Sequence, residues 1–480
     1  MSDGVAFGTP EGRWVIGAAV LGSGVAFLDG TVVNAALPAI AKDLHAGLPS
    51  LQWTLTGYLL TLGALIVVGG SLGDLYGRRR VFVAGLAGFA IASLGCALAP
   101  STGILILARC VQGAAAAALV PGSLALISAS FRVEDRGRAI GAWSGLAGIS
   151  SAIGPFLGGW LIDSVSWRWV FLINLPLSAA AIAVALRHVP ESRDEDAVRH
   201  VDVLGGATLS VGLAGIVYAL IEGPAGASGA VVAVGVTLGV GGLVAFAIIE
   251  ARSPQPMVPL VLFRSRQFSG ANAVTVAVYA AMGIAFFLIV VHLQTDLGYS
   301  ALAAGSALLP VTAIMLVLSS RAGALAQRIG PRWPMTIGPI IVAIALVMLS
   351  GIDPGTSYVS GVLPGMLVFG LGLSITVAPL TAAVLAAVDD HHAGIGSAIN
   401  NAAARIASLL AIAVVPAAAG LSDDFAGGYR KAILISAALA AVGGVIAYVT
   451  IRTAAPVETT AHVPVGPSCH EPCVKIDQAA

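Results

Sequence analysis

The sequence predicts an all-α polytopic membrane protein with fourteen transmembrane helices, arranged as two six-helix bundles plus two inserted helices. Three observations support this fold class: the apolar composition, the length of the apolar runs and an internal repeat. Of the 480 residues, 58% are hydrophobic and 10% are charged, whereas soluble domains carry about 25% charged residues. This composition excludes a water-soluble enzyme and indicates that a lipid bilayer covers much of the surface.

The charges are balanced, with 24 basic and 24 acidic residues. Nucleic-acid-binding proteins need a basic surface, so no nucleic-acid partner is expected. The first thirteen residues include Asp3, Glu11 and a single cation, Arg13, unlike the basic start of a cleaved signal peptide. We therefore expect the first apolar run to stay as an anchor, in a protein that works as a monomer without a cofactor.

Fourteen apolar runs are long enough to cross a bilayer, which needs about 20 residues. The eighth run is rich in glycine and is the weakest of the set. The runs cover residues 14–36, 53–73, 81–99, 103–128, 139–162, 169–186, 203–221, 230–249, 270–293, 302–320, 334–349, 358–379, 399–418 and 432–451.

Basic residues alternate between the connections that join these runs. Connections that follow runs 2, 4, 6, 8 and 10 hold fifteen arginines, and the odd-numbered connections hold only Lys42, Arg168, Arg430 and Lys431. Because basic connections stay in the cytoplasm, both termini are predicted to be cytoplasmic. Arginine outnumbers lysine in this alanine- and glycine-rich chain, which indicates a GC-rich bacterial source and hence the bacterial cytoplasmic membrane.

A shift of 253 residues superimposes 72–79 on 325–332, and each copy joins two predicted helices. Parallel repeats of six helices are typical of secondary transporters, whose substrate path lies between the repeats. The repeat predicts these parts: a cytoplasmic N-terminus (1–13), a first six-helix bundle (14–187), an inserted pair with its loops (188–269), a second six-helix bundle (270–452) and a cytoplasmic polar tail (453–480).

Asp29 is the clearest ionisable residue inside a predicted span. It follows Arg13 by sixteen residues and precedes Pro38 by nine, so it lies about 24 Å from the inner end and about 13 Å from the outer end. Intramembrane carboxyl groups are costly and usually functional, and desolvation lets such groups exchange protons near neutral pH. We interpret Asp29 as a proton carrier; the alternative is a carboxylate permanently paired with a buried cation or capping a broken helix.

Arg109 enters the fourth run from the other direction and reaches nearly the depth of Asp29, about 9 Å from the outer end. Gln112 lies one helical turn further and can share its polar face. The spacing predicts that Arg109 and Asp29 face each other and that Arg109 takes part in proton coupling. The alternative is an arginine that only ties helices together.

Other polar residues carry weaker hypotheses. Glu222 ends the seventh run beside Gly223-Pro224 and is better explained as an interfacial residue than as a second proton site. Five amide residues are weak candidates for the substrate cavity, since polar residues in spans more often join helices: Asn34, Gln112, Asn272, Asn400 and Asn401. The tail sequence 469–473 has metal-capable side chains without zinc-site spacing, so no metal site is expected.

Four ordered motifs resemble those of the major facilitator superfamily, and within it the 14-helix drug:proton antiporters, over residues 14–452. Residues 28–38 look like the helix 1 signature of that group, and residues 70–80 are similar to its loop 2–3 motif A. Arg109, Gln112 and Gly113 match the helix 4 motif. Gly154, Pro155, Gly158 and Gly159 match the helix 5 antiporter motif, whose proline and glycines let a helix bend or pack closely.

The resemblance implies roles for these residues. Asp29 is the protonation site of the family's helix 1 motif, and Arg109 acts in coupling. The conformational latch comprises Gly73, Asp74, Gly77, Arg78 and Arg79, with Asp74 expected at a helix N-terminus near Gly396-Ser397 in the other half; the alternative is a solvated carboxylate. Because Gln327 replaces the acid in the second copy, a symmetric latch is in doubt.

These features predict a proton-driven exporter of amphipathic small molecules that works by alternating access and is not an enzyme. One deep acid among apolar walls suggests neutral or singly cationic substrates. The first alternative is a proton-coupled symporter that imports a solute, and the second is a membrane receptor or scaffold without a transport cycle.

Overall fold

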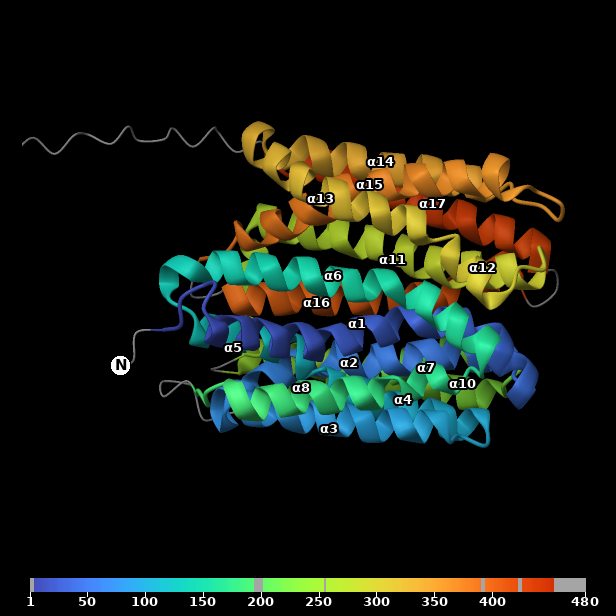
Figure 1. The fold of residues 1–480 in the computed structure, drawn as a ribbon. Coiled ribbons are helices and arrows are strands. Elements are labelled where there is room, and N and C mark those ends of the chain that lie inside the picture. Colours follow the sequence, from blue (N-terminus) through green and yellow to red (C-terminus); the bar gives the residue numbers. More distant parts are fainter. Residues whose placement is uncertain (1–3, 194–201, 254–255, 390–392, 422–424, 453–480) are drawn as a thin grey trace, which may run out of the picture.

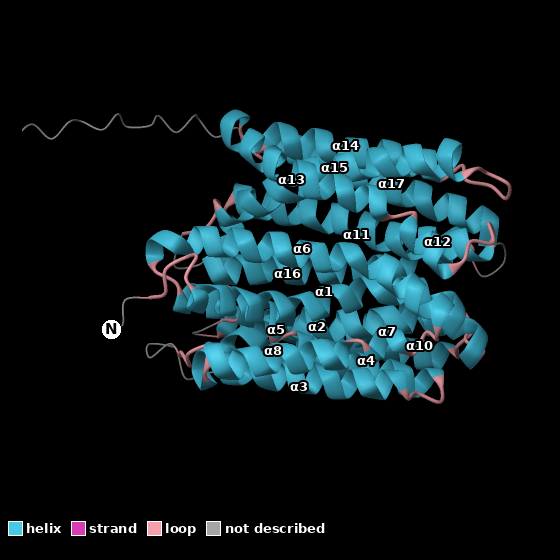
Figure 2. Cartoon of the chain, in the orientation of Figure 1, coloured by secondary structure: helices cyan, strands magenta, loops and turns pink. Residues whose placement is uncertain are grey.

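The computed structural model of the chain describes residues 4–193, 202–253, 256–389, 393–421 and 425–452. The described residues form long helices that run roughly side by side through one bundle (Figure 1). The described part of the chain has no named strand, and its one isolated bridge joins Val5 to Phe131 (Figure 2). The all-helical membrane fold expected from the composition is confirmed.

The helices follow the predicted runs closely and extend most of them by several residues. In chain order they are α1 Pro10–Leu44, α2 Leu48–Tyr76, α3 Arg78–Ala97, α4 Thr102–Ala116, α5 Leu119–Ser130, α6 Val133–Ser164, α7 Trp169–Leu172, α8 Asn174–His188, α9 Val203–Glu222, α10 Gly229–Arg252, η1 Leu260–Arg264, α11 Arg266–Thr295, α12 Ala301–Ser306, α13 Leu309–Ile329, α14 Arg332–Leu349, η2 Tyr358–Val362, α15 Leu363–Leu385, α16 Ala393–Ala419 and α17 Phe425–Thr450.

Thirteen helical stretches of the described residues are long and apolar enough to cross a membrane. Several combine two short elements; α4 and α5, for example, together form the stretch Thr102–Ser130. The predicted span 139–162 lies in α6, which has 32 residues but is not among the thirteen. The chain is a multi-pass membrane protein, and the number fourteen stays a prediction.

The helices pack in two groups, with α1 to α8 in the first and α11 to α17 in the second. Helices α9 and α10 pack on each other, and α9 also contacts α2 and α16, one helix from each group. A Cβ atom on Gly215 of α9 would lie 2.5 Å from the carbonyl oxygen of Gly235 in α10, so the two backbones touch. Only 11% of the most apolar window of α10 is buried, which places this helix at the outside of the bundle.

The repeated loop has the same backbone conformation in both copies. Gly77, between α2 and α3, has φ 109°, and Gly330, between α13 and α14, has φ 83°. Residues other than glycine rarely adopt positive φ because their Cβ atom would clash with the backbone. Glycine at this position of each copy therefore allows the sharp turn that both halves need.

Gly77→Ala should destabilise the protein through this turn. A Cβ atom at Gly77 would lie 2.7 Å from Glu191 Oε1, which is too close for an unstrained contact. A residue with a side chain at positive φ also costs about 1 to 2 kcal/mol. We expect a lower unfolding temperature in lipid nanodiscs than for Gly137→Ala, a helical position where an added Cβ meets nothing within 4 Å. Equal unfolding temperatures for the two variants would contradict this account.

Candidate functional site

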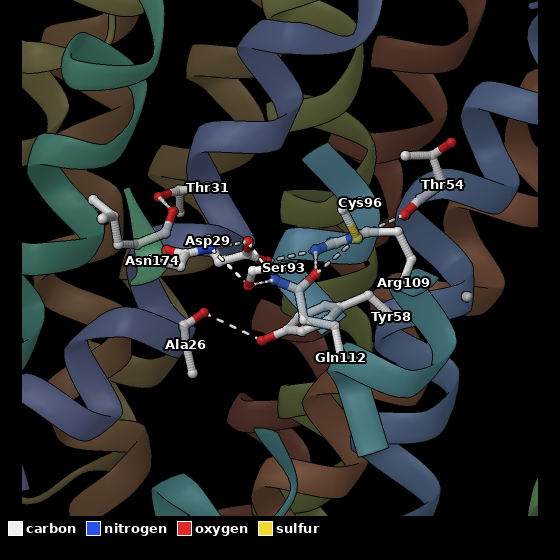
Figure 3. A network of polar contacts seen from close by, with 12 residues as sticks. Ala26, Asp29, Thr31, Thr54, Tyr58, Ser93, Cys96, Arg109, Gln112 and Asn174 are labelled. Atoms are coloured by element: carbon white, nitrogen blue, oxygen red, sulfur yellow. Dashed lines mark hydrogen bonds and ion pairs between the residues drawn. The ribbon is translucent and has the colours of Figure 1, made fainter. Parts of the chain in front are cut away.

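Asp29 lies inside the first helix group and has no exposed surface, at 0%. Its Oδ2 accepts a hydrogen bond from Arg109 Nη1 at 2.5 Å, and its Oδ1 accepts from Gln112 Nε2 and Asn174 Nδ2, each at 2.9 Å (Figure 3). The four side chains come from α1, α4 and α8. The three donors satisfy both oxygens of the carboxylate.

Arg109 is equally enclosed, with 1% of its side chain exposed. Its Nε donates to the backbone carbonyl of Thr54 at 3.0 Å, and its Nη1 also donates to Gln112 Oε1 at 2.6 Å. The guanidinium lies 4.3 Å from the ring centroid of Tyr58, whose hydroxyl donates to the carbonyl of Ala26. The arginine therefore ties α4 to α2 and, through Asp29, to α1.

The pair has no net charge, and both partners are out of contact with solvent. Two charges taken out of water are tolerated together because each compensates the other, whereas a single one left behind is strongly destabilising. The juxtaposition expected from helix depth is present. The structure also has the geometry of the alternative interpretation, a carboxylate paired with a buried cation.

Sequence reasoning missed two members of this network. Ser93 of α3 accepts from Gln112 Nε2 at 2.8 Å and from Asn174 Nδ2 at 3.3 Å, and both Ser93 and Asn174 are 0% exposed. Asn174 lies in the predicted span 169–186, where an amide among apolar residues was a usable signal. Ser93 gave no signal, since single serines are common in membrane helices.

The helix 5 motif packs α6 against both helix groups. A Cβ atom on Gly154 would lie 2.1 Å from Thr31 Oγ1 and 3.2 Å from the carbonyl oxygen of Leu28, the neighbour of Asp29. Similarly, a Cβ on Gly158 would lie 2.4 Å from Val32 Cγ2. These glycines hold α6 against the turns of α1 that carry the acid.

The other side of the same motif faces the second group. A Cβ on Gly159 would lie 2.3 Å from the carbonyl oxygen of Ala301 in α12, and one on Gly305 of α12 would lie 2.0 Å from the carbonyl oxygen of Pro155. Helix α6 stays helical through Pro155. The motif therefore allows backbone contact between the two groups.

The loop 2–3 motif makes its contacts within the first group. Asp74 pairs with Arg78 at 2.8 Å, and Gly77 N donates to the carbonyl of Gly73 at 3.1 Å. Arg79 and Arg80 lie 3.6 Å from Glu191, which follows α8. The described contacts include no hydrogen bond donated by the start of α16 to the carboxylate of Asp74, so the latch to Gly396-Ser397 stays a prediction.

The remaining candidates lie away from Asp29. Asn34 donates to the carbonyl of Thr31 at 3.5 Å, and Glu222 accepts from Trp53 Nε1 at 2.9 Å, which joins α9 to α2. Asn400 donates to Asn272 and Thr275 on α11, and Asn401 donates to the Ser397 carbonyl in its own helix. The bonds of Glu222 and Asn400 join helices, whereas those of Asn34 and Asn401 stay within one helix. The described residues contain no metal-binding group of three ligands, and Cys469 and Cys473 lie outside them.

Arg109→Gln should destabilise the protein more than the double variant Asp29→Asn/Arg109→Gln. Loss of one partner of a buried pair costs about 3 to 5 kcal/mol, whereas the double variant leaves no charge to compensate. Unfolding temperatures in nanodiscs measure the difference, with the exposed Arg264→Gln as control. A double variant as unstable as Arg109→Gln would show that charge compensation is not what holds these residues.

The chain resembles known transporters in sequence and in fold. The family model described as Major Facilitator Superfamily matches residues 19–412. "Multidrug resistance protein Stp" from Mycobacterium tuberculosis is 36% identical over 82% of this chain and 73% of the relative. "Tetracenomycin C resistance and export protein" from Streptomyces glaucescens is 33% identical over 81% of this chain and 72% of the relative.

A solved structure supports the same fold. A POT family transporter in complex with 5-aminolevulinic acid superimposes with a TM-score of 0.69 at 12% identity, over 92% of this chain and 96% of that one. The arrangement of helices described above is thus shared with a distant transporter. Since the family match covers most of the chain, this protein belongs to the major facilitator superfamily of membrane transporters.

Proposed function

We propose that this protein is a proton-driven exporter of amphipathic small molecules, with both termini in the cytoplasm of a bacterial cell. The observation that carries the proposal is the buried pair of Asp29 and Arg109, held by amides from two further side chains. The pair is a proton site whose occupancy changes the charge inside the first helix group. The names of the two relatives, which refer to drug resistance and export, support the outward direction of transport.

Protonation of Asp29 removes the charge that compensates Arg109. The guanidinium then remains as a single cation within the helices, a costly state, and a rearrangement that gives Arg109 other partners becomes favourable. A proton taken up from outside thus reshapes the bundle, and its release to the inside restores the pair. Proton and substrate need not share an atom, because each has only to favour a different state of the same body.

A seam between the helix groups indicates which state the structure represents. In the described part of the chain, four hydrogen bonds join the groups: Asp163 accepts from the backbone N–H groups of Ala301 and Leu302, Gln294 donates to the carbonyl of Ala35, and Gln52 donates to that of Ile412. All four lie toward the end of the bundle opposite the arginine-rich connections. If those connections are cytoplasmic, the seam closes the outer end of the bundle in this state.

Two other functions are separated from export by one measurement. Purified protein in liposomes under an imposed pH gradient would exchange substrate for protons as an exporter and move both together as a symporter. A receptor or scaffold would show no flux. Inward accumulation of substrate with inward proton flow would overturn the proposal.

Asp29→Asn should abolish pH-gradient-driven efflux, measured in proteoliposomes that hold equal amounts of folded protein, because an amide cannot exchange the proton. The control is Asp353→Asn, an exposed acid in the loop after α14. Undiminished efflux by Asp29→Asn would remove this acid from the mechanism.

Asp163→Ala should weaken the outer seam. The carboxylate accepts from Ala301 N at 3.2 Å and from Leu302 N at 2.8 Å, and loss of such a cap costs about 0.5 to 2 kcal/mol. Spin labels are placed at the exposed positions Leu98 and Val359 in a cysteine-free background. Double electron–electron resonance measures the distance between the two labels, and we expect Asp163→Ala to increase the population with long distances.

The control for this change is Ser300→Ala. Ser300 caps the same helix, accepting from Ala303 N at 3.2 Å, but lies in the second group with it. Its loss should leave the distance distribution unchanged. Equal shifts for Asp163→Ala and Ser300→Ala would show that the helix start, and not the bond across the seam, sets the distribution.

A further inference from the structure

Arg405 is a second arginine inside the membrane-spanning helices, and sequence reasoning missed it. It is the thirteenth of the 27 residues of α16, Ala393–Ala419, which is one of the thirteen candidate spans. At 1.5 Å per residue, its Cα lies about 18 Å from the start of the helix. An ionisable residue at such a depth marks a functional site by default.

The side chain of Arg405 lies where the two helix groups meet. A Cβ added to Gly63 of α2 would lie 3.3 Å from Arg405 Cβ, so α2 and α16 touch at this point. Arg405 thus leaves α16 on the side that meets α2, at the seam between the first and second groups.

Unlike Arg109, this arginine has no partner among the described residues in a hydrogen bond or an ion pair. Arg405 is half-buried. A cation held at this depth without a carboxylate is costly, and such a group persists where another function requires it. An incoming anion would supply the missing partner.

The surrounding surface of α16 is polar along one face. Ser397, Asn401 and Arg405 are spaced by four residues, and Ser408 follows three residues later, with its hydroxyl donating to the carbonyl of Tyr279. All four side chains are partly exposed. The face therefore combines one cation with neutral groups that donate and accept hydrogen bonds.

We propose that Arg405 binds the carboxylate of an amphipathic organic anion, so that this transporter prefers acidic substrates to cationic ones. The proposal deepens the proposed function and rests on it for the direction of transport. The expectation of neutral or singly cationic substrates depended on a free charge at Asp29, but Arg109 neutralises that charge. Of the mid-span charges described here, Asp29, Arg109 and Arg405, only the last stays uncompensated, and its sign attracts anions.

Binding of two fluorescent probes with the same ring system and opposite charge tests the proposal. The anion is 9-anthracenecarboxylate and the cation is 9-(aminomethyl)anthracene. Each is titrated by fluorescence anisotropy against the full-length protein in nanodiscs, with empty nanodiscs correcting for partition into lipid. We expect wild-type protein to bind the anion more tightly than the cation.

Variants at Arg405 assign the preference to this side chain. Arg405→Gln should weaken binding of the anion by about tenfold or more, as expected for a lost charge-assisted hydrogen bond, and should not weaken binding of the cation. Arg405→Lys should retain most of the affinity, and Arg328→Gln, at an exposed position of α13, should change nothing. The unfolding temperature of each variant shows that it is folded.

The outcomes separate this inference from the proposed function. Equal affinity of wild-type protein for the two probes, or unchanged binding of the anion by folded Arg405→Gln protein, would overturn the anion site. Absence of proton-coupled exchange in liposomes would overturn the exporter and leave the binding result standing. Binding is measured without a pH gradient, so neither result depends on the other.

Discussion

The ion pair between Asp29 and Arg109 is the interaction on which the first half of the molecule depends. Five helices contribute to its surroundings, since Asp29 is on α1, Thr54 and Tyr58 on α2, Ser93 on α3, Arg109 and Gln112 on α4, and Asn174 on α8. Each charge is tolerated in this interior only because the other compensates it. In the proposed function, a change in the protonation of the carboxyl acts on the packing of these five helices.

Close backbone packing connects that site to the rest of the protein. Gly154 and Gly158 bring α6 against the turn of α1 that carries Asp29, and Gly159 brings the same helix against α12 of the second half. Small residues permit such contact in membranes, where packing replaces the hydrophobic effect as the force between helices. These contacts connect α1 through α6 to the seam, where the carboxylate of Asp163 caps α12.

The two intramembrane arginines differ in what they need. Arg109 has its anion within the protein, and Arg405 takes one from the substrate in the proposed site. If an organic anion leaves while a proton enters, the cell interior gains positive charge twice, because it loses a negative charge and receives a positive one. A membrane potential that is negative inside would then assist export together with the pH gradient.

The sequence by itself determined the fold class, the approximate limits of the spans, the repeat and the depth of Asp29 and Arg109. These follow from hydropathy and from the rise of a helix, which are local properties. The same reasoning explains why Gly77 and Gly330 could be paired before their positive φ angles were known. The roles of the candidate residues in transport stay predictions.

Only the tertiary structure decided which polar groups meet. Asn174 contacts Asp29, and Ser93 contacts the amides of Asn174 and Gln112, because of how α8 and α3 are rotated about their axes. Hydropathy carries no information about that rotation. The cap of Asp163 on α12 joins residues 138 positions apart. The absence of a described partner for Arg405 likewise depends on the faces that α2, α11 and α16 present to one another, because pairing of charges is settled by packing across helices and not by their order along the chain.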